Sequence, residues 1–433
     1  MASLQTHTHD PYAALRVPEF RYWMGASAFS TLAGRALTVA IGYQVYTLTK
    51  SPLALGMLGL VQAIPAVSLA LFGGHLADRY DRRTLVLITR AVSVLAALGF
   101  AFVSRDVQGN GLAALYVIVF IAGIARGFAD PASSAFEAQV VPRELYVNAS
   151  SWSGSVWEVT AIAGPTLGGL FYAAFGVTWT YLLVALLYAL GWIFMALIKR
   201  KPMPPAAPHE SIWASIAVGV RYVYHNQVLL GSMALDLFAV LFGGAVALLP
   251  IFASDILHVG PAGLGLLVAA PSVGALVSML WATRRPPVHN AGRMLLVVVA
   301  GFGVATIVFA LSTVMWLSMV SLAVAGMFDG VSMVIRGTTL RMFSPEHLRG
   351  RIAAVNWIFI GSSNEIGAFE SGVAATIFGV VPSVLLGGLA TLVVVAVTAV
   401  LAPQLRKLDL DPRLHPPEPQ VEPQAGPQAA PAD

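Results

Sequence analysis

Several ionisable residues of this 433-residue chain stand inside long apolar stretches. An unpaired ionised acid near the centre of a bilayer costs on the order of 3 kcal/mol, so such groups must be paired, hydrated in a cavity, or protonated part of the time. A carboxylate whose protonation follows its surroundings can serve as a proton carrier. The candidate proton or substrate sites are Arg35, Arg126, Glu158, Asp236, Asp329, Glu365 and Glu370.

These candidates differ in the roles that they suggest. Glu365 is the best proton carrier by its depth in an apolar stretch, and Asp236 is the next. Arg35 could be the counter-charge for either acid, or could bind an anionic substrate. Arg126, with Asp130 close by, fits a salt-bridge lock and a coupling residue equally well. For each residue, a purely structural ion pair is the competing interpretation, and the sequence leaves both open.

A second group of charges follows the second apolar stretch, in the segment GHLADRYDRR. Gly74 would allow two helices to approach closely, and Asp78 stands where it can pair with Arg79, Arg82 or the start of a neighbouring helix. Together with Arg83, these residues could latch two halves of the molecule in one state and release them in another. An ordinary positively charged loop is the alternative.

A glycine- and proline-rich segment, GPTLGG, lies within the fifth apolar stretch. Pro165 should bend the helix, while Gly164, Gly168 and Gly169 allow close packing against a neighbour. Such a helix suits a rocking contact that seals a central cavity against ion leak. A packing face without directional meaning is the other interpretation.

Composition indicates that these residues stand on membrane helices. The chain is 57% hydrophobic and 11% charged, with a mean hydropathy of +0.77, whereas soluble proteins carry roughly 25% charged residues. We expect an all-α membrane protein with twelve transmembrane helices in two related six-helix bundles. The expected spans are 22–47, 53–76, 84–104, 111–130, 154–176, 178–198, 227–252, 261–283, 292–312, 315–336, 352–377 and 381–402.

Charge and proline set the boundaries around these spans. Lys50 and Arg105 fall in loops after odd-numbered spans, and Arg35 falls inside one; the remaining Lys and Arg lie at the termini, the even-numbered connections and their helix ends. The positive-inside rule therefore predicts that both termini are cytoplasmic. The expected parts are a cytoplasmic N-terminus (1–21), an N-terminal bundle (22–198), a cytoplasmic linker with an amphipathic helix (199–226), a C-terminal bundle (227–402) and a disordered Pro-rich tail (403–433).

The two halves repeat at a separation of 203 positions. Glycines and a phenylalanine coincide in this register: Gly164 with Gly367, Gly169 with Gly372, Phe175 with Phe378, and Gly176 with Gly379. Two related halves predict a cavity at their interface, near the bilayer midplane.

These motifs resemble the major facilitator superfamily. Its loop signature G-x-x-x-D-R-x-G-R-R matches Gly74 to Arg83, except that Asp81 replaces a glycine. Its antiporter motif G-x-x-x-G-P-x-x-G-G matches Thr160 to Gly169, except that Thr160 replaces the first glycine. From about Phe20 to Leu405, the chain is similar to the branch that includes enterobactin and multidrug exporters. The resemblance implies alternating access in the inner membrane, and export of a siderophore or drug-like molecule in exchange for protons.

Other classes of protein find less support. No ATP-binding loop, zinc-protease motif or serine nucleophile elbow occurs, so we expect no enzyme, cofactor or metal centre. There is no cysteine, and the net charge of +4 does not suggest nucleic acid. A proton-coupled importer of the same fold is the main rival, and a non-transporting receptor or scaffold is a weaker one. The sequence leaves open whether an outer-membrane channel cooperates.

Overall fold

The structure is a computed structural model that describes residues 10–105, 111–202 and 212–411. Within these ranges every regular element is a helix, and no strand occurs. The predicted all-α class is therefore confirmed for the described part of the chain. Ten of its helices are long and apolar enough to cross a membrane. The protein is a multi-pass membrane protein, and the twelve crossings stay a prediction.

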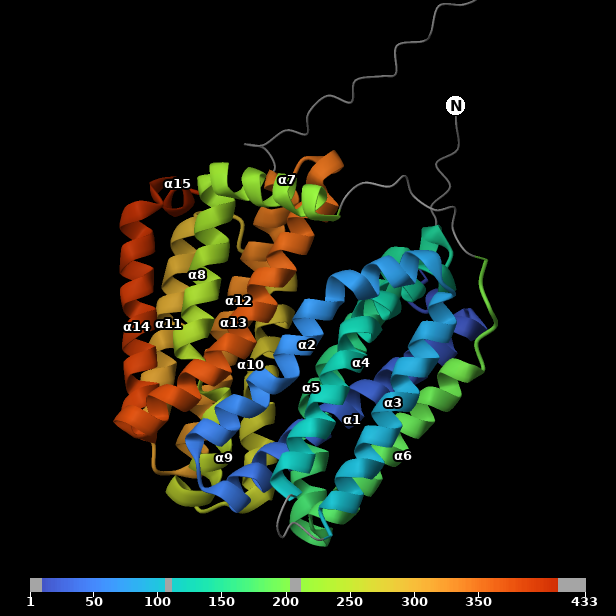
Figure 1. Cartoon of the computed structure of the whole chain (residues 1–433). Coiled ribbons are helices and arrows are strands. Elements are labelled where there is room, and N and C mark those ends of the chain that lie inside the picture. The colour runs from blue at the N-terminus through green and yellow to red at the C-terminus, as the bar shows by residue number, and fades with distance from the viewer. Residues whose placement is uncertain (1–9, 106–110, 203–211, 412–433) are drawn as a thin grey trace, which may run out of the picture.

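The first half of the chain forms one group of packed helices, here called the N group (Figure 1). Within it α1 packs on α5 and α6, α3 packs on α4 and α6, and α2 packs on α4. The members are α1 (Pro18–Thr49), α2 (Pro52–Arg79), α3 (Arg82–Val103), α4 (Gly111–Val140), α5 (Tyr146–Phe175) and α6 (Val177–Ala196).

The second half forms the C group, in which α8 packs on α13 and α14, α10 on α12, and α11 on α12 and α14. A short helix, α7 (Ile212–His225), precedes it and packs on α13. The members are α8 (Gln227–Gly243), η3 (Ala245–Leu248), α9 (Leu249–Ile251), η4 (Phe252–Ile256), α10 (Gly260–Arg284), α11 (Ala291–Leu311), α12 (Met315–Phe343), α13 (Arg349–Phe378), α14 (Val380–Leu401) and α15 (Pro403–Arg406).

Equivalent glycines end α5 and α13. Gly176 joins α5 to α6 with φ +83°, and Gly379 joins α13 to α14 with φ +90°. Both values lie in the region that only glycine adopts without strain. The predicted equivalence of these two glycines is thus confirmed by their backbone conformation.

Two pairs of helices join the groups: α5 packs on α10, and α2 packs on α13. Away from these contacts the groups diverge toward the end that carries α7 and α15 (Figure 1). We call that end the terminal end and the opposite one, where α9 lies, the distal end. Neither α5 nor α13 is among the ten strongly apolar helices, although each has 30 residues. Both helices bear candidate acids and face protein on several sides, so they need fewer lipid-facing apolar residues.

Both termini differ in part from the expectation. Helix α1 begins at Pro18, four residues before the predicted span, and Ala14 is buried and donates its N–H to the Asn148 side chain at 3.0 Å. The predicted disordered tail is wrong for its first residues, because Leu405 and Leu410 are buried against the C group. The Leu410 N–H also donates to the carbonyl of Val288 at 2.8 Å. Residues 412–433 and most of the Pro-rich linker lie outside the described residues.

The C group depends on backbone contact between α10 and α12. A Cβ placed on Gly326 would lie 2.0 Å from the carbonyl oxygen of Pro271. We therefore expect Gly326→Ala to destabilise the protein by about 1–3 kcal/mol through overpacking. Thermal unfolding of the purified protein in detergent measures this change. Gly350→Ala is the matched control, because a Cβ there meets nothing within 4 Å; equal unfolding temperatures for both variants would contradict the packing.

Candidate transport site

The distal end is closed by two pairs of glycines that touch across the groups. Gly56 of α2 lies against Gly372 of α13, where a Cβ on either residue would come within 3.1 Å of the other's Cα. Gly169 of α5 lies against Gly265 of α10 in the same way. Gly169 and Gly372 are equivalent in the internal repeat, so each contact takes one glycine from the repeated segment of α5 or α13.

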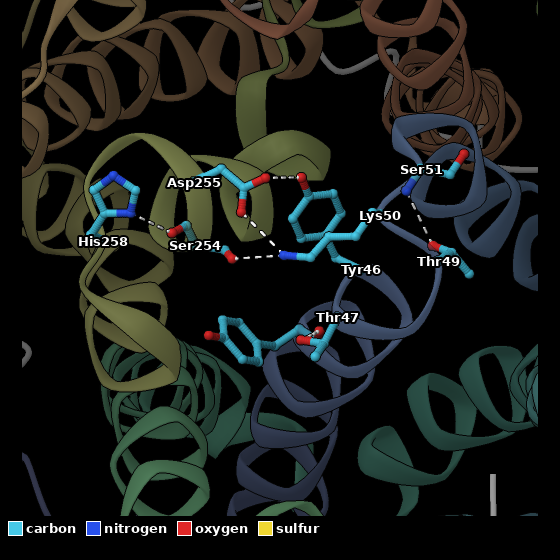
Figure 2. A network of polar contacts seen from close by, with 9 residues as sticks. Tyr46, Thr47, Thr49, Lys50, Ser51, Ser254, Asp255 and His258 are labelled. Atoms are coloured by element: carbon cyan, nitrogen blue, oxygen red, sulfur yellow. Dashed lines mark hydrogen bonds and ion pairs between the residues drawn. The ribbon is translucent and has the colours of Figure 1, made fainter. Parts of the chain in front are cut away.

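A polar network closes the same end beside these glycines (Figure 2). Lys50, at the end of α1, forms an ion pair with Asp255 of η4 at 3.3 Å. The Tyr46 hydroxyl donates to the other oxygen of that carboxylate at 2.5 Å, and the Lys50 ammonium also donates to Ser254 Oγ at 3.4 Å. The network therefore joins the N group to the C group at the distal end.

Local backbone conformation positions both partners of this ion pair. Lys50 caps α1 in the left-handed region, with φ 50°, and donates its N–H to the carbonyl of Tyr46 at 2.8 Å. Asp255 stands in a π-helical turn, a form that is common at functional positions. In the sequence Lys50 is only a loop charge and Asp255 has no distinguishing pattern, because nothing local links positions so far apart.

A second ion pair crosses between the groups in the middle of the molecule. Arg126 of α4 pairs with Glu365 of α13 at 3.6 Å and with Asp130 of its own helix at 3.4 Å. The side chain of Arg126 is 50% exposed and that of Glu365 is 24% exposed, although both stand well inside their helices. Gly59 of α2 faces this part of α13, where a Cβ would lie 3.1 Å from the Cβ of Ala368. These residues thus face the space into which the groups diverge.

Arg35 occupies a neighbouring position on α1. Its guanidinium lies over the ring of Trp157 at 4.9 Å and interacts electrostatically with Arg126 and Glu158. Trp157 remains 54% exposed. A guanidinium stacked on an exposed indole can bind planar or anionic groups.

Asp236 and Asp329 belong to a separate cluster inside the C group. Arg336 of α12 forms an ion pair with Asp236 of α8, and a second one with Asp329 at 3.4 Å. The side chains of Arg336 and Asp236 are 16% and 11% exposed. The expectation that Arg35 is the counter-charge of Glu365 or Asp236 is therefore wrong in this structure, because Arg126 and Arg336 occupy those places. Arg336 is the last residue of the predicted span 315–336, so the sequence indicates a helix-end charge there and not a partner for Asp236.

Glu370 lies apart from these groups. It lines a small cavity inside the C group, together with Gly244 at the end of α8 and Ser383 of α14. The structure thus divides the seven predicted residues among three places. Arg35, Arg126, Glu158 and Glu365 stand between the groups, Asp236 and Asp329 stand with Arg336, and Glu370 stands in the small cavity.

Among the described residues, the charged loop after α2 binds its own group and, through Asp81, Arg200 of the linker at 3.5 Å. Asp78 pairs with Arg82 at 3.3 Å, and Arg82 also donates to the carbonyl of Ala135 on α4 at 3.2 Å. Arg83 donates to the carbonyls of Ala196 and Ile198, at the end of α6, at 2.7 and 2.5 Å. The loop therefore fastens α2 and α3 to α4 and α6, and its role as a latch between halves stays a prediction.

Two details of this loop differ from the expectation. The close approach of helices lies at Gly73, where a Cβ would come within 2.4 Å of the carbonyl of Gly127, whereas Gly74 has nothing within 4 Å. Asp81, which replaces the glycine of the superfamily signature, accepts the N–H of Arg83 at 3.2 Å and caps α3. Arg79 is an exposed residue at the end of α2.

The glycine–proline segment of α5 packs on two helices at once. Gly164 and Gly168 lie against Arg35 and Ala36 of α1, where a Cβ would come within 2.5 and 2.7 Å. On the other side, the Pro165 carbonyl oxygen would lie 2.4 Å from a Cβ on Gly265 of α10. Gly164 and Gly168 thus pack within the N group, Pro165 and Gly169 pack against the C group, and the antiporter role of this motif stays a prediction.

The chain was compared with models of known protein families, and one of them matches nearly its whole length. Residues 9–431 match the model of the transmembrane secretion effector family. The chain belongs to this family of the major facilitator superfamily. Its members and relatives are transporters and not enzymes, as predicted.

Curated relatives include enterobactin exporters. The chain is 26% identical to the enterobactin exporter EntS of Citrobacter koseri over 402 residues, which cover 93% of this chain and 95% of the relative. It is also 26% identical to EntS of Escherichia coli over 396 residues, covering 91% and 94%. The resemblance to the enterobactin exporter branch is thereby confirmed.

Solved transporters share the fold at low sequence identity. A POT family transporter in complex with a thioalcohol-conjugated peptide superposes with a TM-score of 0.71 at 12% identity, covering 89% of this chain and 96% of that one. A bacterial homologue of the lysosomal transporter Spinster, in an inward-facing and unoccupied conformation, gives a TM-score of 0.67 at 13% identity, covering 90% and 95%.

The closed distal end yields a direct test of the Lys50–Asp255 contact. Because both side chains are about half exposed, we expect the pair to contribute about 0–1 kcal/mol, so Asp255→Asn should open the end in part of the population. The distance between spin labels at exposed Leu53 and His258, measured by double electron–electron resonance, should then lengthen. The exchanged pair Lys50→Asp with Asp255→Lys should restore it. An unchanged distance distribution in Asp255→Asn would contradict the role of this contact.

Proposed function

We propose that the protein exports a small organic molecule, a siderophore or a drug-like compound, across the inner membrane by alternating access in exchange for protons. Membership of the secretion effector family and the likeness to enterobactin exporters support the direction. The distribution of Lys and Arg supports cytoplasmic termini. With that orientation the diverging terminal end would receive substrate from the cytoplasm, and the distal end would release it outward.

The ion pair between Arg126 and Glu365 is the observation that carries the proposal. It joins α4 to α13 at 3.6 Å, between the groups, and is only partly shielded from solvent. Protonation of Glu365 would remove one charge and weaken the attraction across the gap, while Arg126 would keep Asp130 as its partner. A proton that arrives from the distal side could thus change how the two groups attract one another.

Substrate recognition is assigned to the neighbouring residues. Arg35 and the exposed face of Trp157 offer a cation and an aromatic surface in one place. An anionic or aromatic molecule fits this pair better than a cation does. Siderophores are the first class to test, in keeping with the enterobactin exporters, and drug-like aromatic compounds are the second.

The cluster of Asp236, Arg336 and Asp329 is a second candidate proton site. Two carboxylates share one guanidinium there, so at least one acid is incompletely neutralised when both are ionised. Because Asp236 and Arg336 are nearly buried, we assign this cluster chiefly to holding α8 and α12 together.

The proposed coupling role of Glu365 has a clear test. Glu365→Gln keeps the shape of the side chain but removes its charge, and should abolish proton-driven efflux while the protein still reaches the membrane. The measurement is dissipation of an imposed pH gradient in everted vesicles by siderophores and antibiotics. Glu346→Gln is the control, since Glu346 is a 92% exposed side chain on the 3-10 turn η5 (Glu346–Leu348), just before the same helix.

The outcomes separate the parts of the proposal. Loss of compound-dependent dissipation in Glu365→Gln alone supports proton exchange through this residue. Full activity of Glu365→Gln would remove Glu365 from coupling. A wild-type protein that accumulates compounds in intact cells would overturn export in favour of uptake.

A further inference from the structure

Helix α8 is interrupted in the middle of a membrane span. The apolar stretch Gln227–Ile256 counts as one span, but its α-helix ends at Gly243 and continues as the 3-10 turn η3, the short α9 and the π-helical η4. A helix end leaves carbonyl oxygens without their usual partners. Hydroxyl groups of neighbouring helices form hydrogen bonds with two carbonyl oxygens near this end. Ser371 donates to Gly244 O at 3.2 Å, and Thr391 donates to Ala239 O at 3.3 Å.

A carboxylate stands beside this interruption. Glu370 of α13 lines a cavity of about 10 Å³ together with Ser371, Ser383 and the backbone of Phe242 to Ala245. No basic side chain of the described residues forms an ion pair with Glu370. An ionised carboxylate at such a depth needs a counter-charge.

The internal repeat shows that this arrangement is specific to the second half. Glu370 and Ser371 are equivalent to Leu167 and Gly168, which stand 203 positions earlier. Gly168 packs on α1, which runs without interruption from Pro18 to Thr49, whereas Ser371 binds α8 at its interruption. The acid, the hydroxyl and the broken helix thus occur together in one half and are all replaced in the other.

Both serines bring a hydroxyl oxygen to the cavity, and Ser371 also interacts with the Glu370 carboxylate. Ser371 donates its hydroxyl proton to Gly244 O, and Ser383 donates to Val380 O at 2.9 Å. Each hydroxyl oxygen keeps lone pairs with which it can bind a cation. Together with the Glu370 carboxylate and the carbonyls at the end of α8, they form an all-oxygen set of ligands, the kind that hard cations prefer.

We infer that this cavity binds a sodium ion. Its volume suits one water-sized body, so the ion would enter without most of its hydration shell. One carboxylate balances one positive charge, and a divalent cation would call for more acids. The ion would join α8, α13 and α14 at the interruption, while Glu365 would bind and release the proton.

Binding can be measured on the purified full-length protein without any substrate. We expect NaCl to raise the unfolding temperature above that in choline chloride of equal ionic strength, and radioactive ²²Na⁺ to bind. Glu370→Gln should weaken ²²Na⁺ binding at least about tenfold, a change equivalent to 1.4 kcal/mol. Glu346 is an exposed acid on the preceding 3-10 turn η5 (Glu346–Leu348), and Glu346→Gln should bind ²²Na⁺ as the wild type does.

Further variants keep the test decisive if Glu370→Gln folds poorly. Glu370→Leu and Ser371→Gly install the residues of the first half, Leu167 and Gly168, and should also lose sodium binding. Absence of a sodium effect in the wild type, or full binding by these variants, would overturn the site. Because the assay uses no transport, its failure would leave the proposed export untouched.

Discussion

An ionised side chain in the apolar interior of a membrane needs an opposite charge or water, and this requirement organises the middle of the molecule. Arg126 meets it across the gap between the groups by pairing with Glu365, and within its own helix by pairing with Asp130. Arg336 meets it inside the C group by pairing with Asp236. The first ion pair joins the N group to the C group, whereas the second lies within the C group.

Glycine contacts give this electrostatic arrangement a mechanical basis. Gly56 on Gly372 and Gly169 on Gly265 bring helix backbones together at the distal end, where any larger residue would hold the groups apart. One glycine of each contact, Gly169 or Gly372, belongs to the internal repeat. The Lys50–Asp255 pair adds a contact that is exposed and therefore easily broken.

The sequence predicted features that depend on local pattern. The helical class and the glycine packing on α5 follow from hydropathy and spacing over a few turns. The equivalence of Gly176 and Gly379 follows from the internal repeat, which compares two short segments. The partners of the intramembrane charges could not be predicted, because Arg126 and Glu365 are far apart in the chain and meet only after the N group and the C group assemble. The interruption of α8 could not be predicted either, because Gln227–Ile256 is as apolar as the spans that have no interruption.

We propose that the two ends of the molecule open in alternation. Double electron–electron resonance on spin labels at Tyr80 and Met342, exposed near the terminal ends of α2 and α12, compared with the distal pair Leu53 and His258, tests it in lipid nanodiscs. We expect that lowering the pH or adding a transported compound changes the Tyr80–Met342 distance and the Leu53–His258 distance in opposite directions. Distances that change in the same direction, or do not change at all, would contradict it.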